Sequence, residues 1–180
     1  MPVKYIDPAT IEEFADNIRR ENPVAVIKDG AMELVDIYKL AEALGCKVEE
    51  VDFDPPQVSA RVIRNKATDS SYAYTIQVSR RDSTRRKKFS VAHEISHIVL
   101  HDDGKSNFVE LRQPSGSYDA RNLFKETQAN MLAAALLLPA DQVRKAWYEV
   151  KSVDQVADIF SVTTTAAYNR LDNLGLLLDD

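Results

Sequence analysis

The stretch FSVAHEISHIVLH, residues 89–101, contains the pattern HExxH within a run of helical periodicity. His93 and His97 are four residues apart, so on an α-helix they differ by about 40° in direction and about 6 Å in height. Both imidazoles can therefore reach one ion. Glu94 lies beside the open coordination position of such an ion, where its carboxylate can act as a general base. The pattern predicts a catalytic metal centre, against the alternative of an exposed helix with incidental histidines.

The third metal ligand is not expected from the same helix. His101 is eight residues from His93, about 12 Å farther along the helix axis, so one ion cannot be reached by all three histidines. Position 103, where metzincins place a third histidine, is occupied by Asp103. We therefore expect His101 not to be a ligand and the third ligand to come from another segment.

The segment ETQAN, residues 126–130, supplies a candidate, because it opens a strongly apolar predicted helix. Glu126 and Asn130 are one helical turn apart, so Glu126 can bind the metal while Asn130 accepts a hydrogen bond from the other nitrogen of a ligand histidine. Glu126 can instead be a solvated acid near a helix N-terminus, stabilised by the helix dipole. An asparagine directly before eight apolar residues weakens that alternative, because a buried amide needs a partner.

These motifs together resemble the ImmA/IrrE family of bacterial and phage metallopeptidases: HExxH after a basic-Phe lead-in, then E-x-x-A-N entering an A-A-x-L-L-x-P helix. The resemblance covers about residues 34–178. It implies His93, His97 and Glu126 as zinc ligands, Glu94 as catalytic base, and cleavage of a helix-turn-helix repressor as the task. Ser96 replaces a frequent glycine of the family and Leu132 a frequent phenylalanine, which affects packing rather than chemistry.

Composition is that of an ordinary soluble domain: 180 residues, 20.2 kDa, 44% hydrophobic and 28% charged. A chain of this length can bury a core without a metal, so a metal site is interpreted as functional first. The single cysteine, Cys46, excludes an internal disulfide and favours a reducing compartment. No signal-peptide pattern is present, and the longest apolar stretch, 131–138, is far short of the ~20 residues that span a membrane. We expect a cytoplasmic protein with no membrane contact.

The sequence predicts an α+β fold, mainly helical, with a small β-sheet: a zincin-like metallopeptidase domain over 1–149 and helix-turn-helix-like helices over 150–180, packed on that domain. Helical periodicity predicts one helix over about 35–44 and six further helices, and alternation of apolar residues predicts three strands. The polar segment 102–120 is expected to be a long loop. The expected helices are 8–20, 87–101, 121–138, 140–149, 152–160 and 164–173, and the expected strands are 47–53, 60–64 and 72–79.

The C-terminal segment argues against direct DNA binding, despite its helix-turn-helix pattern. Residues 150–180 carry a net charge of −3, where a phosphate backbone requires positive potential. Packing against the peptidase domain or gripping a protein partner is the preferred interpretation. The opposite charge is concentrated in residues 80–88, which carry +5 on a chain of net −5. This run is either a solvated loop or is held by an acidic substrate segment or an internal acid.

The leading functional hypothesis is a zinc endopeptidase with one Zn²⁺, another divalent metal being the alternative, that cleaves a repressor-like regulatory protein. A strand such as 72–79 is expected to hold the substrate by edge pairing. Tyr118 and Arg121 are weak candidates for an oxyanion stabiliser, because they lie near Glu126 in sequence. The rival hypothesis is a non-hydrolytic regulatory or toxin–antitoxin module that binds a protein partner with the same fold. Glu94 favours the enzyme, because a purely structural metal site has no use for it.

Overall fold

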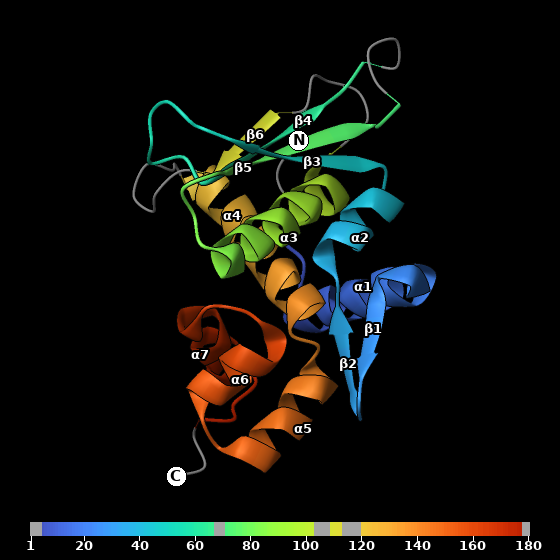
Figure 1. The fold of residues 1–180 in the computed structure, drawn as a ribbon, viewed down its shortest axis with the longest axis vertical. Coiled ribbons are helices and arrows are strands. Elements are labelled where there is room, and N and C mark those ends of the chain that lie inside the picture. The colour runs from blue at the N-terminus through green and yellow to red at the C-terminus, as the bar shows by residue number, and fades with distance from the viewer. Residues whose placement is uncertain (1–4, 67–70, 103–108, 113–119, 178–180) are drawn as a thin grey trace.

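A four-stranded sheet covers the helix that carries the HExxH motif, in a computed structural model that describes residues 5–66, 71–102, 109–112 and 120–177 (Figure 1). The strand order is β3-β5-β4-β6. The sheet contains one parallel pair, β3 with β5, and two antiparallel pairs, β4 with β5 and β4 with β6. The strands are β3 (Cys46–Val51), β4 (Ala60–Arg64), β5 (Tyr74–Ser79) and β6 (Val109–Arg112).

The topology corrects the expected substrate strand. Strand β5, the core of the predicted segment 72–79, lies between β3 and β4, so both of its edges are already hydrogen-bonded. The prediction that a substrate pairs with an edge of this strand is therefore wrong. The outer strands of the described sheet are β3 and β6. Strand β6 falls within the segment 102–120 that was expected to be loop throughout.

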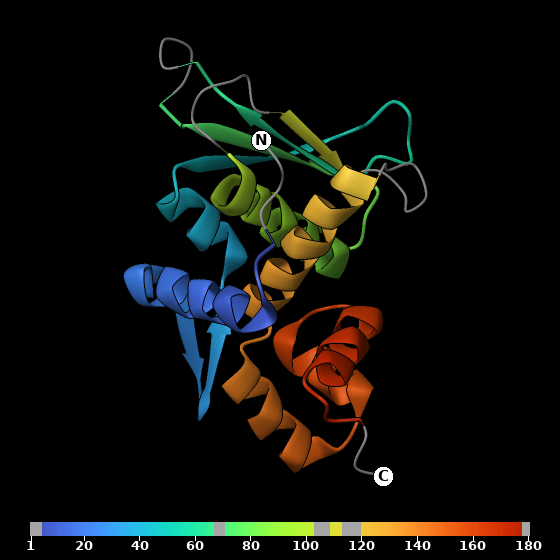
Figure 2. The ribbon, with the colours of Figure 1, turned by 180° about the vertical axis from the view of Figure 1, so that it is seen from behind.

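Helix α3 (Thr84–His101) lies between the sheet and helix α4 (Ala120–Leu137), which crosses it (Figures 1 and 2). Because α3 is covered from both sides, every residue from Ser90 to His97 is buried. The helix begins three residues before the expected Lys87, since the Ser83 hydroxyl accepts a hydrogen bond from the Arg86 amide and caps it. The fully buried HExxH turn thus sits at the centre of the fold.

The remaining elements surround this pair. Helix α1 (Pro8–Glu21) packs on α4, and α2 (Ile37–Ala43) packs between α3 and strand β3. A short 3₁₀ turn, η1 (Pro23–Ala25), leads into a small hairpin of β1 (Val26–Asp29) and β2 (Met32–Val35), which the sequence interpretation missed. The expected mainly helical α+β class is confirmed.

Among the described residues, three helices follow Pro139: α5 (Ala140–Val150), α6 (Val153–Phe160) and α7 (Thr164–Asn173). The α6–turn–α7 unit has a helix-turn-helix arrangement, with Ser161 in the left-handed region at φ 53°. Its buried apolar side chains belong to one continuous core with those of α1 to α4. Those side chains are Val156, Ala157, Phe160, Val162, Ala167 and Leu171.

Cys46 and Ser96 are two small side chains of the core. Cys46 is buried, and burial raises the pKa of its thiol to about 12, as suits an unreactive core residue. Ser96 is also fully buried, and its hydroxyl donates to the Ala92 carbonyl at 2.7 Å. A serine in the place of the family's frequent glycine is therefore accommodated without leaving its hydroxyl unsatisfied.

Candidate metal centre

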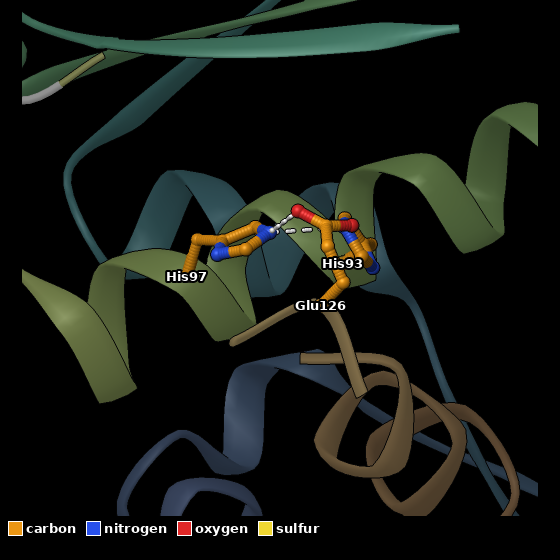
Figure 3. Close-up of side chains that lie close together, drawn as sticks. All are labelled: His93, His97 and Glu126. Carbon is orange, nitrogen blue, oxygen red and sulfur yellow. Dashed lines mark hydrogen bonds and ion pairs between the residues drawn. The ribbon is translucent and has the colours of Figure 1, made fainter. Parts of the chain in front are cut away.

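His93 and His97 point from one face of α3 toward Glu126 on α4 (Figure 3). The Nε2 atoms of the two histidines are 3.0 Å apart. Glu126 Oε2 lies 3.1 Å from His93 Nε2, and Glu126 Oε1 lies 3.1 Å from His97 Nε2. Three potential ligand atoms from two helices thus converge on one point.

This arrangement fits a zinc ion. The ligand atoms of His93, His97 and Glu126 all lie within 4.8 Å of one another. Zinc–ligand bonds of about 2.0–2.1 Å at tetrahedral angles place neighbouring ligand atoms about 3.3 Å apart, close to the separations seen here. Two imidazoles and one carboxylate form a donor set that leaves a fourth position for water or substrate. The three residues would hold such an ion as ligands.

The electrostatics of Glu126 favour its ligand role. Burial by itself raises the pKa of this carboxyl group, but hydrogen bonds from His93 and His97, and the charge of these rings, outweigh it and lower the pKa to about 2. The group is therefore a carboxylate at neutral pH, which is the form that binds metal. Only 12% of its side chain is exposed, so it is not the solvated helix-terminal acid considered as an alternative.

Glu94 lies beside the first histidine on α3 and is fully buried. Removing a carboxyl group from bulk water is costly unless the group is paired or hydrogen-bonded. Its place in the turn between His93 and His97 suits the task of general base beside the metal position.

His101 lies outside the ligand cluster, as expected from its distance along the helix. Its ring packs beside that of His97 with centroids 5.4 Å apart. Its Nε2 lies 3.2 Å from the carbonyl oxygen of Lys125 on α4. The residue is half-buried and connects the two ligand-bearing helices rather than binding the ion.

The structure does not bring Asn130 to the histidines. Its side chain is exposed, and among the described residues no hydrogen bond joins it to His93 or His97. It lines a cavity of about 830 Å³ between α1, α3, α4 and α7. The helical spacing correctly placed Asn130 one turn after Glu126 on α4, but Asn130 lies on a different face of the helix from the one that meets the histidines. Tyr118 lies outside the described residues, and so does the side chain of Arg121.

A second polar cluster anchors the end of α3 to the sheet, and sequence reasoning missed it. Asp102, directly after α3, has a side chain only 4% exposed. It accepts hydrogen bonds from the Tyr74 hydroxyl on β5 at 2.6 Å and from Arg64 Nε on β4 at 3.0 Å. The partners are 28 and 38 residues away in sequence, so no local pattern could have shown the cluster.

The basic run 80–88 is held largely by acids of the same chain. Four of its six cations pair with acidic side chains near the end of β3, in the turn before α3 and on α6, while Arg80 and Arg86 also remain exposed to solvent. The pairs are Arg80 with Asp52 (2.8 Å), Lys87 with Glu50 (2.8 Å), Arg86 with Asp82 (3.3 Å) and Arg85 with Asp158 (2.6 Å).

Fold and site together define a domain of the metallopeptidase type. A family model described as the IrrE N-terminal-like domain, of the peptidase M78 family, matches residues 41–172. The chain belongs to this family, which confirms the resemblance found in the motifs. Among curated proteins, no match to the chain is found.

A solved structure of a Mycobacterium tuberculosis transcriptional regulator has a similar fold, with a TM-score of 0.57 and 21% sequence identity. The similarity covers 93% of this chain and 47% of the regulator, so this chain spans about half the regulator's length. In the part of the chain that the structure describes, none of the helices is both long and apolar enough to cross a bilayer.

Proposed function

We propose that the chain is a zinc-dependent endopeptidase that cleaves a helix-turn-helix repressor or a similar regulatory protein in the cytoplasm. The observation that carries this proposal is the convergence of His93, His97 and Glu126 beside the buried Glu94. A structural zinc site is closed by four protein ligands, whereas this cluster offers three and a neighbouring base. Membership of the M78 family supports a peptidase activity, and its repressor substrate is inferred from the family resemblance.

A zinc ion held by these residues would supply a Lewis acid for the scissile carbonyl and would acidify water. Glu94 takes a proton from the attacking water and later delivers it to the leaving amine, which is the general acid–base role that a carboxylate performs from this position. His93, His97 and Glu126 keep their geometry because two packed helices carry them. The burial of both histidines keeps bulk water away from the reacting groups.

The substrate main chain is proposed to pair with β6 instead of β5. Strand β6 has one side paired with β4 and lies at the outer end of the described sheet. It connects α3 with α4 in the chain, and its partner β4 packs on α3, whereas the other outer strand, β3, packs against α2. An unpaired strand edge offers hydrogen bonds to an extended peptide.

Direct DNA binding is not part of the proposed function. Arg170 is one of the two basic residues of 150–180 and is only 4% exposed, being used to join α7 to α1 and α4. The structure therefore leaves the C-terminal helices with still less exposed positive charge than their sequence indicates.

The test is to incubate the zinc-loaded protein with a candidate repressor-like protein and to identify the fragments by mass spectrometry. Wild type is expected to cleave, and Glu94→Gln, which removes a proton acceptor and no ligand, is expected to bind metal and repressor without cleavage. Equal cleavage by both proteins contradicts the general-base role. Repressor binding without cleavage by the wild type would favour the non-hydrolytic regulatory or toxin–antitoxin module instead.

A further inference from the structure

A hydrogen bond joins the end of α3 to α4 at Lys125, the residue before the third ligand, Glu126. His101 Nε2 lies 3.2 Å from the carbonyl oxygen of Lys125, which is 24 positions away in sequence. A carbonyl oxygen only accepts hydrogen bonds, so Nε2 carries the proton and donates it. Glu126 follows Lys125 directly, so this hydrogen bond acts on the turn of α4 from which the carboxylate ligand projects.

The same end of α3 is tied to the sheet on its other side. Asp102, the next residue, accepts hydrogen bonds from Tyr74 and Arg64 on β5 and β4. Two consecutive residues therefore connect three layers, the sheet, α3 and α4, about one turn beyond His97. The distance from the two histidines to Glu126 depends on how α4 is placed along α3. The hydrogen bond from His101 to the Lys125 carbonyl restrains this relative position of the two helices.

The ring of His101 also packs beside the ligand His97, at 5.4 Å between centroids and 52° between planes. His101 therefore contacts the ligand His97 through its ring. Through its N–H it contacts the backbone of Lys125, the residue before the ligand Glu126. Its own nitrogens are not in the ligand cluster.

We propose that His101 is a positioning residue for the metal centre: its Nε2–H, donated to the Lys125 carbonyl, holds Glu126 at binding distance from His93 and His97. The inference rests on the proposed zinc site. Groups outside the ligand set that orient ligands are worth about 10-fold to 100-fold in metal affinity, and this is the size of effect expected here.

A matched pair of amides tests this role. In His101→Gln, the side-chain nitrogen is the same number of bonds from Cβ as Nε2 of histidine, so it can donate to the Lys125 carbonyl. In His101→Asn, the amide is one methylene shorter and cannot reach it. Zinc affinity is measured by competition with a chromophoric chelator, and the d–d absorption of the Co²⁺-loaded proteins reports ligand geometry.

We expect His101→Gln to bind zinc close to wild type, with an unchanged Co²⁺ spectrum. His101→Asn should bind about 10-fold to 100-fold more weakly with an altered spectrum. Equal affinities and spectra for the two variants overturn the proposal. If both variants are weakened equally and melt at the same lower temperature without metal, His101 acts in packing alone, which overturns the proposal as well.

Two reference variants separate this proposal from the zinc site itself. Glu126→Ala must lose zinc: if it does not, the site assignment fails, whereas a loss in Glu126→Ala with wild-type binding in His101→Asn refutes only the role of His101. Asp102→Asn removes the tie to the sheet on the opposite side of α3. It should lower the melting temperature of the metal-free protein while weakening zinc binding less than His101→Asn does.

Discussion

Arg170 of α7 and Glu12 of α1 form a bidentate ion pair although they are 158 positions apart in sequence. Arg170 Nη2 lies 2.8 Å from Glu12 Oε2. The remaining donor of the guanidinium, Nε, bonds the carbonyl of Leu138 at the end of α4, at 2.9 Å. One buried arginine thus joins the C-terminal helices both to the first helix of the chain and to the helix that carries Glu126.

Replacing Arg170 by methionine should destabilise the protein by about 2–3 kcal/mol. Truncating one partner of a buried pair costs about 3–5 kcal/mol, and the cost is reduced here because the Glu12 side chain is 32% exposed and can be rehydrated. Urea unfolding followed by circular dichroism measures the change. Arg144→Met on the exposed side of α5 is the matched control and should change stability by no more than about 0.5 kcal/mol. Equal small effects for both variants would contradict the linking role.

The same contact predicts the outcome of a DNA-binding experiment. We expect no duplex affinity tighter than the roughly 10⁻⁴–10⁻⁶ M of non-specific binding at physiological salt, because Arg170 is buried and residues 150–180 carry a net −3. A gel-shift titration at 150 mM salt with random and gene-proximal duplexes measures this. A nanomolar, sequence-specific shift that is lost in a correctly folded Arg170 variant would instead support a DNA-binding regulator.

The cluster of candidate metal ligands could be predicted from local sequence patterns. His93 and His97 share a face through a spacing of four, and the burial of Glu126 follows from its place at the start of an apolar helix. Asn130 shows the limit of this reasoning. It is about one turn from Glu126, but a spacing of four residues differs from a full turn by about 40°. The angle at which two helices cross also depends on their packing and cannot be derived from the sequence of either helix alone. The structure leaves Asn130 on the cavity side of α4.

A small sheet and three of its strands were predicted, but the order in which the strands pair was not. The expected strands 60–64 and 72–79 pair locally as the hairpin of β4 and β5, whereas the pairing of β3 parallel to β5 joins segments with a full strand between them. That non-local pairing puts β5 in the interior and removes its edge. Strand β6 was missed because its sequence, VELR, is four residues long within a polar segment, too short for a periodic pattern to show. The Asp102 cluster depends on the same long-range pairings.

Metal stoichiometry should follow the three converging side chains. His93→Ala and His97→Ala should each lose the single equivalent of zinc that wild type retains after gel filtration, because two ligands do not hold the ion against dilution. Elemental analysis of the three purified proteins gives the result. Thr127→Ala, beside Glu126 on the exposed side of α4, is the control and should retain full zinc. Full occupancy in both histidine variants would refute the site.

The low pKa of Glu126 predicts how the metal-free protein responds to acid. A carboxyl group with a pKa of about 2 in the folded state and an ordinary value of 4.5 stabilises the fold while it is ionised. This contribution is fully present above the ordinary value and is lost as the pH falls from about 4.5 toward 2, because protonation of the folded form removes the favourable contact with His93 and His97.

Glu126→Gln has no such proton to take up, so the comparison isolates this group. The free energy of unfolding of chelator-treated wild type and of Glu126→Gln is measured in urea at pH 5.5 and pH 3. The difference in favour of wild type should be larger at pH 5.5 than at pH 3, since every other acid is common to both proteins and cancels. A difference that stays constant between the two pH values would mean that Glu126 has an ordinary pKa and is not held against the two histidines before metal binds.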